Sequence, residues 1–267
     1  MPAMSPVASC SRPRQQAACR IDAMKVSIVI PVRNERDTAI ALIERVRAVE
    51  CGMEKELIVV DGASTDGTRD ALEAYAAAGD VQVVLEEKAR GKGAAVRTGF
   101  ERATGDIMMV QDADLELDPS EIPLLLAPIV AGRTRVVFGS RFKSRGRGKT
   151  PLVGYAGNFA LTMAANLLYF GRLTDILTCY KVLRADIVPA LQLRCNGFDL
   201  DAEIACKLLR SREKIVEVPV TYQPRGVDDG KKLSPSVGWS VLRVIVRERF
   251  AARRPVAAPV TAANTPD

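Results

Sequence analysis

Two carboxylates on alternate residues, Asp112 and Asp114, follow the apolar run Ile107-Met108-Met109-Val110. Like charges at the end of a buried strand repel each other, and packing does not require them there. A divalent cation relieves that repulsion, and carboxylate oxygens suit Mg²⁺ or Mn²⁺, which in turn hold phosphate oxygens. Glu116 could supply one more oxygen to the same cation. The pattern therefore predicts a metal site that binds phosphates, and the alternative is an ordinary polar turn after a strand.

Two other apolar runs also end in polar residues. Asp61 follows Leu57-Ile58-Val59-Val60, and the run at 26–30 leads into Pro31-Val32-Arg33-Asn34-Glu35. Because the carboxyl ends of parallel strands meet at one rim of the sheet, where open α/β folds bind ligands, we expect these residues to form one site. Asp61 can accept hydrogen bonds from a base or a ribose, while the loop at 64–67 holds its rotamer. A helix cap is the alternative explanation for that loop.

Basic residues in three loops are candidates for binding phosphate. Arg90-Gly91-Lys92-Gly93 opens a predicted helix and resembles a phosphate-binding loop, although the glycine-rich fingerprint of dinucleotide and P-loop sites is absent. Arg141 begins the basic loop at 141–150, and Lys231 and Lys232 lie in a loop that could close over a phosphorylated ligand. Solvated basic loops are the alternative. The carboxylates that we expect near the same cleft are Asp175, Asp199, Asp201 and Glu203.

Alternating strands and helices must position these residues. The hydrophobic pattern first predicts strands at 26–30, 57–60, 81–85 and 107–110, separated by helices at 38–49, 68–78 and 94–103. It then predicts helices at 122–130, 158–170, 200–211 and 239–252, with strands at 135–139, 181–183 and 215–219. This alternation indicates an α/β fold with a mostly parallel Rossmann-like sheet flanked by helices. The helix at 158–170 is apolar on most faces, so we expect it to be buried or to face an apolar partner.

The composition of the 267-residue chain excludes several classes of site. Its net charge of +6 and pI of about 9.1 suit anionic partners, whereas no nucleic-acid recognition motif accompanies the dispersed basic residues. The six cysteines form no Cys-x-x-Cys pair and histidine is absent, which excludes zinc sites of the usual spacing and histidine-based catalysis. We expect buried cysteines in a reducing cytosol. No apolar run approaches the ~20 residues of a transmembrane helix.

The sequence predicts one large domain with a small C-terminal extension. Residues 1–23 show no signal-peptide pattern and are expected to be a disordered leader before Met24, which is a candidate start. The α/β domain is expected over 24–222, followed by a mobile loop and a helix over 223–254. The Ala/Pro-rich stretch at 255–267 is expected to be a disordered tail.

Taken in order, these segments resemble family 2 glycosyltransferases of the GT-A fold over residues 25–239. The motifs that carry the resemblance are Ile28-Val29-Ile30-Pro31 with Asn34-Glu35, Val59-Val60-Asp61 with Ser64-Thr65-Asp66-Gly67-Thr68, Gly91-Lys92-Gly93-Ala94-Ala95-Val96-Arg97, and Asp112-Ala113-Asp114. Motifs in the second half are similar to those of the dolichol- or polyprenol-phosphate sugar transferase branch: Gly139-Ser140-Arg141-Phe142, Thr174-Asp175 with Thr178-Cys179-Tyr180-Lys181, residues 198–203, Glu217-Val218-Pro219 and Gly230-Lys231-Lys232. Four linked motifs in a fixed order are far more specific than any one of them.

The resemblance implies a metal-dependent, inverting hexosyltransferase that uses a nucleoside-diphosphate sugar and a polyprenyl (dolichyl or undecaprenyl) phosphate. It implies that the sugar nucleotide is bound by Pro31, Arg33, Asn34, Glu35, Asp61, Ser64, Lys92, Asp112 and Ala113. It assigns Mg²⁺ or Mn²⁺ to Asp114 and Glu116, and the acceptor phosphate to Arg141, Lys231 and Lys232. The catalytic candidates are Arg141, Asp175, Asp201 and Glu203. The enzyme would be cytoplasmic, with peripheral contact at the inner face of the membrane through the segment at 158–170 or the final helix.

Other activities stay open from the residues. A phosphate monoester acceptor is already anionic near neutral pH and needs no strong base, whereas a hydroxyl acceptor, soluble or on a glycan, would need a carboxylate base such as Asp175 or Asp201. A sugar-nucleotide-binding protein without transferase activity would keep the same cleft. A nucleotidyltransferase would be expected to carry a glycine-rich basic loop after its first strand, which this chain lacks. The sequence identifies neither the sugar, the base nor the oligomeric state.

Overall fold

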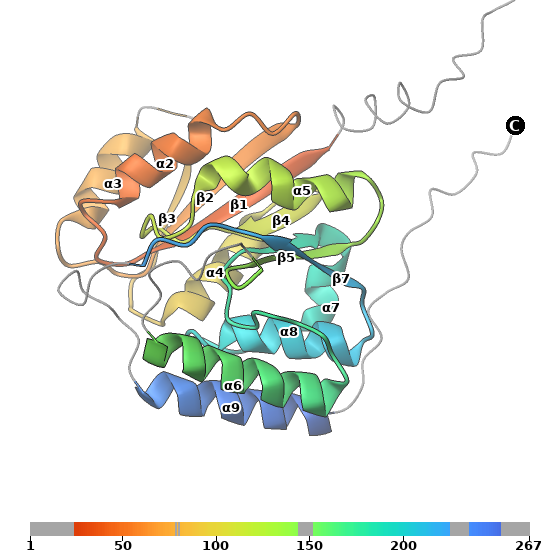
Figure 1. The fold of residues 1–267 in the computed structure, drawn as a ribbon. Coiled ribbons are helices and arrows are strands. Elements are labelled where there is room, and N and C mark those ends of the chain that lie inside the picture. The colour runs from red at the N-terminus through yellow and green to blue at the C-terminus, as the bar shows by residue number, and fades with distance from the viewer. Residues whose placement is uncertain (1–23, 78, 80, 144–151, 225–234, 252–267) are drawn as a thin grey trace, which may run out of the picture.

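The computed structural model describes residues 24–77, 79, 81–143, 152–224 and 235–251. These residues form an α/β fold around a seven-stranded sheet with the order β3-β2-β1-β4-β6-β5-β7 (Figure 1). The strands are β1 (Lys25–Val32), β2 (Glu54–Asp61), β3 (Gln82–Leu85), β4 (Ile107–Val110), β5 (Val136–Ser140), β6 (Lys181–Arg184) and β7 (Ile215–Pro219). Only β6 runs antiparallel to its neighbours, β4 and β5, within this sheet. The predicted mostly parallel sheet is confirmed.

Strands and helices alternate regularly in the first half of the chain. Helices α2 (Ala39–Ala48), α3 (Thr68–Ala76) and α4 (Lys92–Arg102) follow β1, β2 and β3. Val32 of β1 pairs in register with Asp61 of β2, and Val29 pairs with Val110 of β4. All four residues of β4 are buried, as is usual for a strand covered on both faces. The register therefore places the residues that follow β1, β2 and β4 at one rim of the sheet, as the sequence predicts.

The second half is less regular than the first. Its elements are η1 (Pro119–Glu121), α5 (Ile122–Val130), α6 (Leu152–Tyr169), η2 (Ala185–Ile187), α7 (Val188–Leu191), α8 (Leu200–Arg210) and α9 (Pro235–Phe250). The long helix α6 begins at Leu152 rather than at 158, and α9 begins at Pro235 rather than at 239. The sequence missed η1, η2 and α7, because three or four residues are too few to show a helical period.

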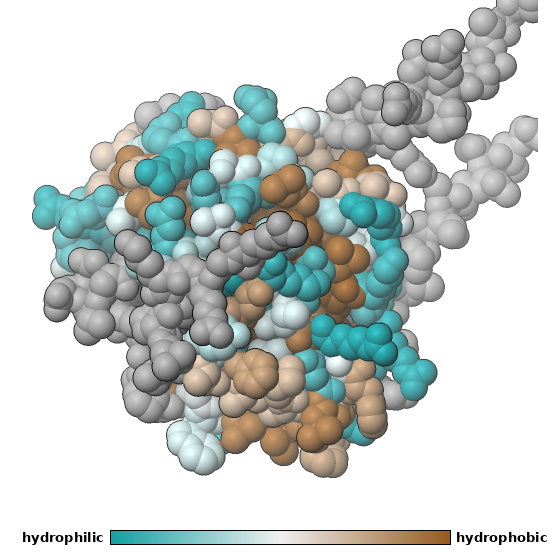
Figure 2. All heavy atoms as spheres, viewed as in Figure 1, coloured by the Kyte–Doolittle hydropathy of each residue, from teal (hydrophilic) through white to brown (hydrophobic). Residues whose placement is uncertain are grey.

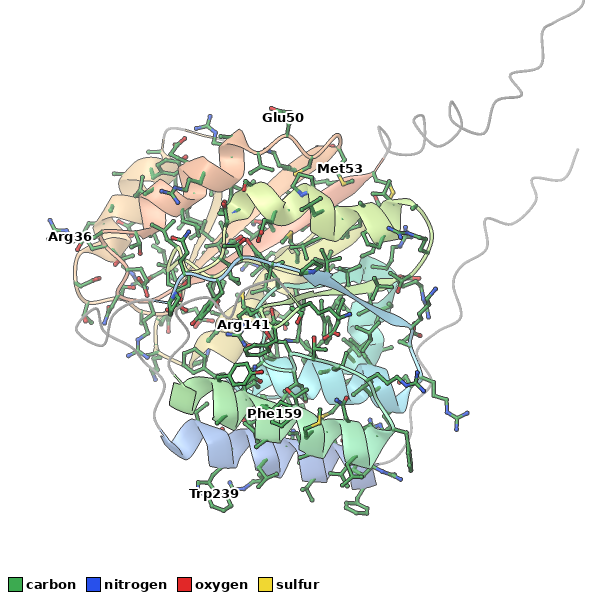
Figure 3. The ribbon with its side chains drawn as sticks, viewed as in Figure 1. Arg36, Glu50, Met53, Arg141, Phe159 and Trp239 are labelled. Atoms are coloured by element: carbon green, nitrogen blue, oxygen red, sulfur yellow. The ribbon has the colours of Figure 1, made fainter. Side chains whose placement is uncertain are left out.

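The helices form layers on the two sides of the sheet. Helices α2, α3 and α5 lie on one side, while α8 lies on the other, with α6 and α9 side by side beyond it (Figure 1). Val241, Val244 and Ile245 form the buried inner face of α9. Tyr169 Oη donates a hydrogen bond to the carbonyl oxygen of Ile245 at 2.8 Å. Trp239 projects from the opposite face of α9 (Figure 3). None of the described helices combines the length and apolar character needed to cross a membrane.

Candidate functional site

Hydrogen bonds tie the loop after β1 to the loop after β2. The N–H of Asn34 donates to Ser64 Oγ at 2.9 Å, and the N–H of Thr65 donates to Asn34 Oδ1 at 2.9 Å. The N–H of Glu35 donates to Thr68 Oγ1 at 3.0 Å. Asn34 has a left-handed φ of 53°, a conformation that asparagine tolerates better than most residues. The structure therefore brings three predicted sugar-nucleotide residues, Asn34, Glu35 and Ser64, into one bonded group.

Asp61 is fully buried at the end of β2 and has a cationic partner. Its carboxylate accepts a hydrogen bond from the N–H of Ser64 at 3.2 Å and from Arg69 Nε at 2.9 Å. Arg69 also donates to the carbonyl oxygen of Glu86. A buried carboxylate needs such compensation, which fixes its orientation at the rim. The role of Asp61 in holding a base or ribose stays a prediction.

Alternating charges run from the end of β4 to the start of α8. Lys92 Nζ lies 2.7 Å from Asp112 Oδ1 and 3.7 Å from Asp201 Oδ2, and Lys181 Nζ lies 3.1 Å from Asp201 Oδ1. Burial, the largest influence, acts to lower the pKa of Lys92, but the two carboxylates outweigh it and the pKa is raised well above its usual value. Lys181 is fully buried, 5.0 Å from the centre of the Phe138 ring, and burial lowers its pKa. Asp201 is thus held between two lysines.

Two glycines allow the start of α4 to approach the loop before α8 closely. A Cβ on Gly91 would overlap with the carbonyl oxygen of Asn196, and one on Gly93 would lie 2.6 Å from the carbonyl oxygen of Cys195. Gly91 also has a φ of 103°, which side chains rarely adopt. Lys92 lies between these glycines, so the close approach helps to set its position. The glycines serve backbone packing, whether or not the loop also binds phosphate.

The structure places Glu203 away from this charge chain. Its carboxylate accepts hydrogen bonds from the N–H groups of Arg194 and Cys195 at 2.9 and 2.8 Å, and from Lys207 Nζ at 2.6 Å. Burial, the largest influence, acts to raise its pKa, but Lys207 and the two N–H donors outweigh it and the pKa is lowered. Residues two apart on a helix point in directions about 200° apart, so Glu203 and Asp201 leave opposite sides of α8. The contacts of Glu203 anchor the loop before α8, and its catalytic role stays a prediction.

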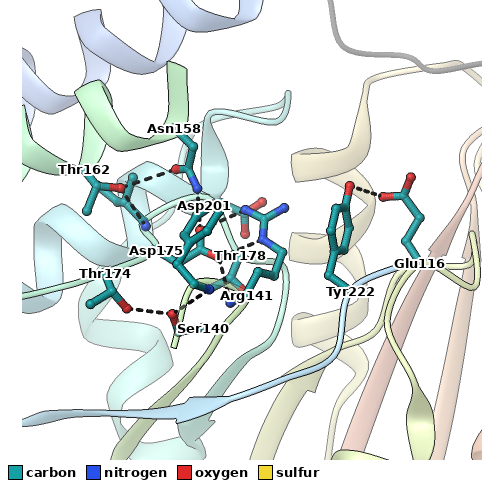
Figure 4. Close-up of polar contacts among 12 residues, drawn as sticks. Glu116, Ser140, Arg141, Asn158, Thr162, Thr174, Asp175, Thr178, Asp201 and Tyr222 are labelled. Carbon is teal, nitrogen blue, oxygen red and sulfur yellow. Dashed lines mark hydrogen bonds and ion pairs between the residues drawn. The ribbon is translucent and has the colours of Figure 1, made fainter. Parts of the chain in front are cut away.

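Asp114 and Glu116 lie on a tight turn after β4. Burial, together with the negative charges of Asp112 and Glu116, raises the pKa of Asp114 to about 7. Leu115, between them, has a left-handed φ of 60°, which is rare for leucine. Tyr222 Oη donates a hydrogen bond to Glu116 Oε2 at 2.8 Å (Figure 4). This turn therefore gathers carboxylates whose mutual repulsion is only partly relieved by Lys92, which pairs with Asp112.

The donor set of this turn fits a divalent cation that arrives with its substrate. Within the part of the chain that the structure describes, no three His, Cys, Asp or Glu side chains are grouped to hold a metal by themselves. Mg²⁺ usually keeps several waters and is bound by one or two carboxylates plus substrate phosphates, rather than by a cage of protein ligands. Asp114 and Glu116 offer hard oxygen donors, and the raised pKa of Asp114 reports the negative charge that a cation would neutralise.

Arg141 and Asp175 form a two-point ion pair beyond β5 (Figure 4). Arg141 Nε lies 2.7 Å from Asp175 Oδ2, Nη2 lies 2.8 Å from Oδ1, and Asn158 Nδ2 donates to Oδ1 at 2.8 Å. Asp175 is fully buried. Burial acts to raise the pKa of Asp175, but the Arg141 charge and these hydrogen bonds outweigh it and the pKa is lowered. The Arg141 guanidinium lies 5.1 Å from the centre of the Tyr222 ring, so Tyr222 links this pair to the carboxylate turn.

The other predicted site residues have less definite places. Pro31 is part of β1, Arg33 is exposed just beyond it, and Ala113 is buried between the two aspartates of the turn. Lys231 and Lys232 lie outside the described residues. The sequence reasoning missed three side chains that hold the site together: Arg69, Lys181 and Tyr222. The sequence could have indicated the role of Lys181, because a lysine inside an apolar strand needs a buried carboxylate as its partner.

A family model and two curated relatives match the chain. The model of glycosyl transferase family 2 matches residues 27–189. A dolichol-phosphate mannosyltransferase from Pyrococcus furiosus is 31% identical over 232 residues, which cover 84% of this chain and 63% of that protein. An undecaprenyl-phosphate mannosyltransferase from Micrococcus luteus is 31% identical over 243 residues, covering 86% of this chain and 96% of that protein. The chain thus spans less than two thirds of the Pyrococcus relative and nearly all of the Micrococcus one.

Solved structures also resemble the fold. The crystal structure of glucosyl-3-phosphoglycerate synthase from Mycobacterium tuberculosis, in complex with Mn²⁺, UDP and phosphoglyceric acid, superposes with a TM-score of 0.66. It covers 91% of this chain and 86% of its own at 20% identity. At that identity the likeness concerns the fold alone, and it confirms the GT-A fold that the sequence predicts.

Proposed function

The chain belongs to glycosyl transferase family 2, and on that premise we propose that it transfers a hexose from a nucleoside-diphosphate sugar to a polyprenyl phosphate. The names of the two mannosyltransferase relatives support this choice of acceptor. The transfer is an inverting displacement that depends on Mg²⁺ or Mn²⁺. The observation that carries the proposal is the state of the carboxylates Asp175 and Asp201, both of which are held by cations.

A carboxylate that is paired with a cation is a poor general base. Arg141 lowers the pKa of Asp175, so this group has little tendency to take a proton near neutral pH. Asp201 contacts both Lys92 and Lys181 and would have to leave them to accept one. A phosphate monoester needs no such base, because its oxygen is already anionic. The pairing of both carboxylates with cations therefore favours the lipid phosphate over a hydroxyl acceptor, soluble or on a glycan.

Different residues would bind the donor, the cation and the acceptor. The loops after β1 and β2, with Asp61 at their centre, hold the base and ribose of the donor. Asp114 and Glu116 would hold the cation, which would neutralise charge on the leaving diphosphate. An acceptor phosphate oxygen attacks the anomeric carbon as the bond from that carbon to the diphosphate breaks. Arg141, oriented by Asp175, would bind the acceptor phosphate through its positive charge. Lys231 and Lys232 are proposed to bind the same phosphate.

An apolar surface on α6 and α9 supports an acceptor that resides in a membrane. Among the described residues, every exposed large apolar side chain except Leu124 lies on this outer apolar surface: Phe159, Met163, Leu167, Phe170, Trp239, Val246 and Phe250. Figure 2 shows apolar residues gathered over these two helices. The exposed fractions reach 78% for Leu167 and 87% for Phe170, which is unusual for side chains that water alone would cover. We propose that this surface contacts the inner face of the membrane from the cytoplasm, as amphipathic helices do.

A screen of nucleoside-diphosphate sugars tests the proposed function. Purified protein is incubated with each donor and Mg²⁺ or Mn²⁺, with and without polyprenyl phosphate, and nucleotide release and lipid-linked sugar are both measured. The proposal expects one donor to give lipid-linked sugar that disappears in excess EDTA. Transfer only to soluble or glycan hydroxyl groups would favour a hydroxyl acceptor. Donor binding without any turnover would favour a non-catalytic sugar-nucleotide-binding protein.

A further inference from the structure

A second basic cluster lies at the far end of α8 from the candidate site. A cavity of about 160 Å³ opens between α7, α8 and α9, and its wall carries the positive side chains Arg194, Lys207, Arg210 and Arg247. Asp201 is the second residue of α8 and Arg210 is its last, so the two lie roughly 14 Å apart along the helix axis. None of these four cations belongs to the groups assigned to donor, metal or acceptor. The cavity is therefore separate from the transfer site.

The four cations have only two carboxylates within reach among the described residues. Lys207 Nζ lies 2.6 Å from Glu203 Oε1, and Arg210 Nη1 lies 3.6 Å from Glu248 Oε2. Arg247 Nη2 shares both acids, at 3.8 Å from Glu203 and 3.0 Å from Glu248. The cluster is thus left with a surplus of positive charge. A concave surface with such a surplus attracts anions.

Arg210 lines the cavity, and one of its N–H donors has no acceptor among the described residues. The Nε–H of Arg210 is buried, and no described residue accepts its hydrogen bond. The rest of the guanidinium is held in place, because Nη1 donates to the carbonyl oxygens of Glu248 and Ala251. A buried N–H without an acceptor costs about 1–3 kcal/mol, so an acceptor at this point is strongly favoured. Lys207 and Arg210 are nearly buried while Arg194 and Arg247 are exposed, which leaves an entrance for a ligand.

We propose that this cavity binds a phosphate group. Three of its four cations are arginines, whose planar guanidinium groups match phosphate oxygens better than a point charge does. The cavity has room for several waters or for one phosphate with part of its ester. The phosphate would pair with Lys207 and Arg210 at the inner wall and with Arg194 and Arg247 at the entrance. This second site goes beyond the proposed transferase function and does not depend on it.

The phosphate could come from a lipid headgroup or from solution. Arg247 lies on α9 between Val246 and Phe250, both of which belong to the outer apolar surface. A phospholipid could therefore place its headgroup in the cavity while its acyl chains remain in the bilayer beside α9. A free phosphate or phosphorylated metabolite would use the same donors. The chemistry of the site is common to both sources.

The side-chain signal of Arg210 can be used to follow phosphate binding. Side-chain ¹H–¹⁵N NMR of the full chain follows the Nε–H signal of Arg210, assigned by its loss in Arg210→Lys, during titration with inorganic phosphate at constant ionic strength. The proposal expects a saturable shift that chloride does not reproduce. Arg194→Gln removes an exposed cation at the entrance and is expected to weaken phosphate binding about tenfold, the cost of one charge-assisted hydrogen bond. The matched control Arg243→Gln removes an exposed cation from α9 outside the cavity and is expected to change binding less than twofold. No saturable shift, or equal weakening by the two substitutions, overturns the proposal.

A vesicle experiment identifies the source of the phosphate. Sedimentation with phosphatidylcholine vesicles that contain phosphatidylglycerol compares Arg194→Gln with Arg133→Gln, which removes an exposed cation after α5, on the other side of the sheet from α9. A lipid source predicts that Arg194→Gln lowers binding more than Arg133→Gln and that inorganic phosphate competes. A free-phosphate source predicts equal losses, with the Arg210 titration intact. Neither measurement uses sugar transfer, so failure of this site and failure of the proposed function are distinguishable.

Discussion

Asp114, on the turn after β4, and the carboxylates near β6 and α8 have opposite electrostatic surroundings. Asp114 is buried among acids, and its pKa rises to about 7 because of burial and two neighbouring carboxylates. Asp175 is also buried, but Arg141 pairs with both of its oxygens and its pKa is lowered. Asp201 is likewise held between two lysines. The same side-chain type is therefore left unbalanced on one side of the site and neutralised on the other.

Under the proposed function, this difference would let one site bind two anionic substrates without a strong base. The unbalanced side would take a cation, and a cation would bring diphosphate oxygens with it. On the neutralised side, Asp175 orients Arg141, and both Asp175 and Asp201 are paired with cations, which suits an acceptor that carries its own negative charge.

The largest expected effect follows loss of a carboxylate from the unbalanced side. Asp114→Ala should lower kcat/KM about a thousandfold or more, because the cation contributes several kcal/mol to the transition state. The free energy of unfolding should not fall, since the substitution removes a repulsion. Initial rates of nucleotide release and urea unfolding measure the two quantities. Asp70→Ala, an exposed aspartate of α3, is the control; full turnover by Asp114→Ala or in excess EDTA would refute the assignment.

Loss of a carboxylate from the neutralised side should act mainly on stability. Asp175→Asn leaves the Arg141 charge without its buried partner, and breaking such a pair costs about 3–5 kcal/mol of unfolding free energy. Urea unfolding measures this cost. Residual transfer should keep the pH dependence of the unmodified protein, because Asp175 does not carry the proton. Loss of one limb of the pH–rate profile without loss of stability would instead identify Asp175 as a base.

Substitution of Asp61 tests whether the loops after β1 and β2 bind the donor. Asp61→Ala should raise the KM for the donor about ten- to hundredfold with a smaller change in kcat, because a contact with the base or ribose is similar in ground and transition states. Arg69→Met breaks the same ion pair but keeps the carboxylate, so its effect on KM should be smaller. Steady-state kinetics with varied donor separates the two. A collapse of kcat at unchanged KM would contradict this role for Asp61.

Substitution of Glu203 has the smallest expected effect, which is a pH-dependent loss of unfolding free energy. Its pKa in the folded chain is lower than the ordinary value of 4.5, so its contribution to stability is present above that value and is lost as pH falls through the folded pKa. Glu203→Gln should therefore lower the free energy of unfolding by about 1–3 kcal/mol at pH 6–8. The difference from the unmodified protein should shrink below pH 4.5. Urea unfolding across this range measures it, and a difference that grows at low pH would contradict the assignment.

Sequence patterns located the rim of the sheet that carries the candidate site, because local rules determine its place. Asp61, Asp112 and Asp114 each follow an apolar run, and parallel register brings the ends of such runs to one rim. The strand at 107–110 and the helix at 122–130 have the predicted bounds, since apolar segments flanked by polar residues mark both. These features depend on residues that are close in the chain.

The neutralised side depends on contacts that no local pattern reveals. Arg141 and Asp175 are 34 positions apart, and they meet because the antiparallel strand β6 returns beside β5. Tyr222 reaches Glu116 across 106 positions. Helical periodicity could have separated Asp201 from Glu203, because residues two apart lie on different faces of a helix. The tertiary ion pairs themselves could not be read from the sequence.

The central claim is that the acceptor supplies its own negative charge. A polyprenyl phosphate and the polyprenol of the same chain length differ only in that group, so they form a matched pair of acceptors. With the active donor and Mg²⁺ or Mn²⁺, the account predicts lipid-linked sugar from the phosphate and none above background from the alcohol. Transfer to the alcohol at a comparable or higher rate would contradict it.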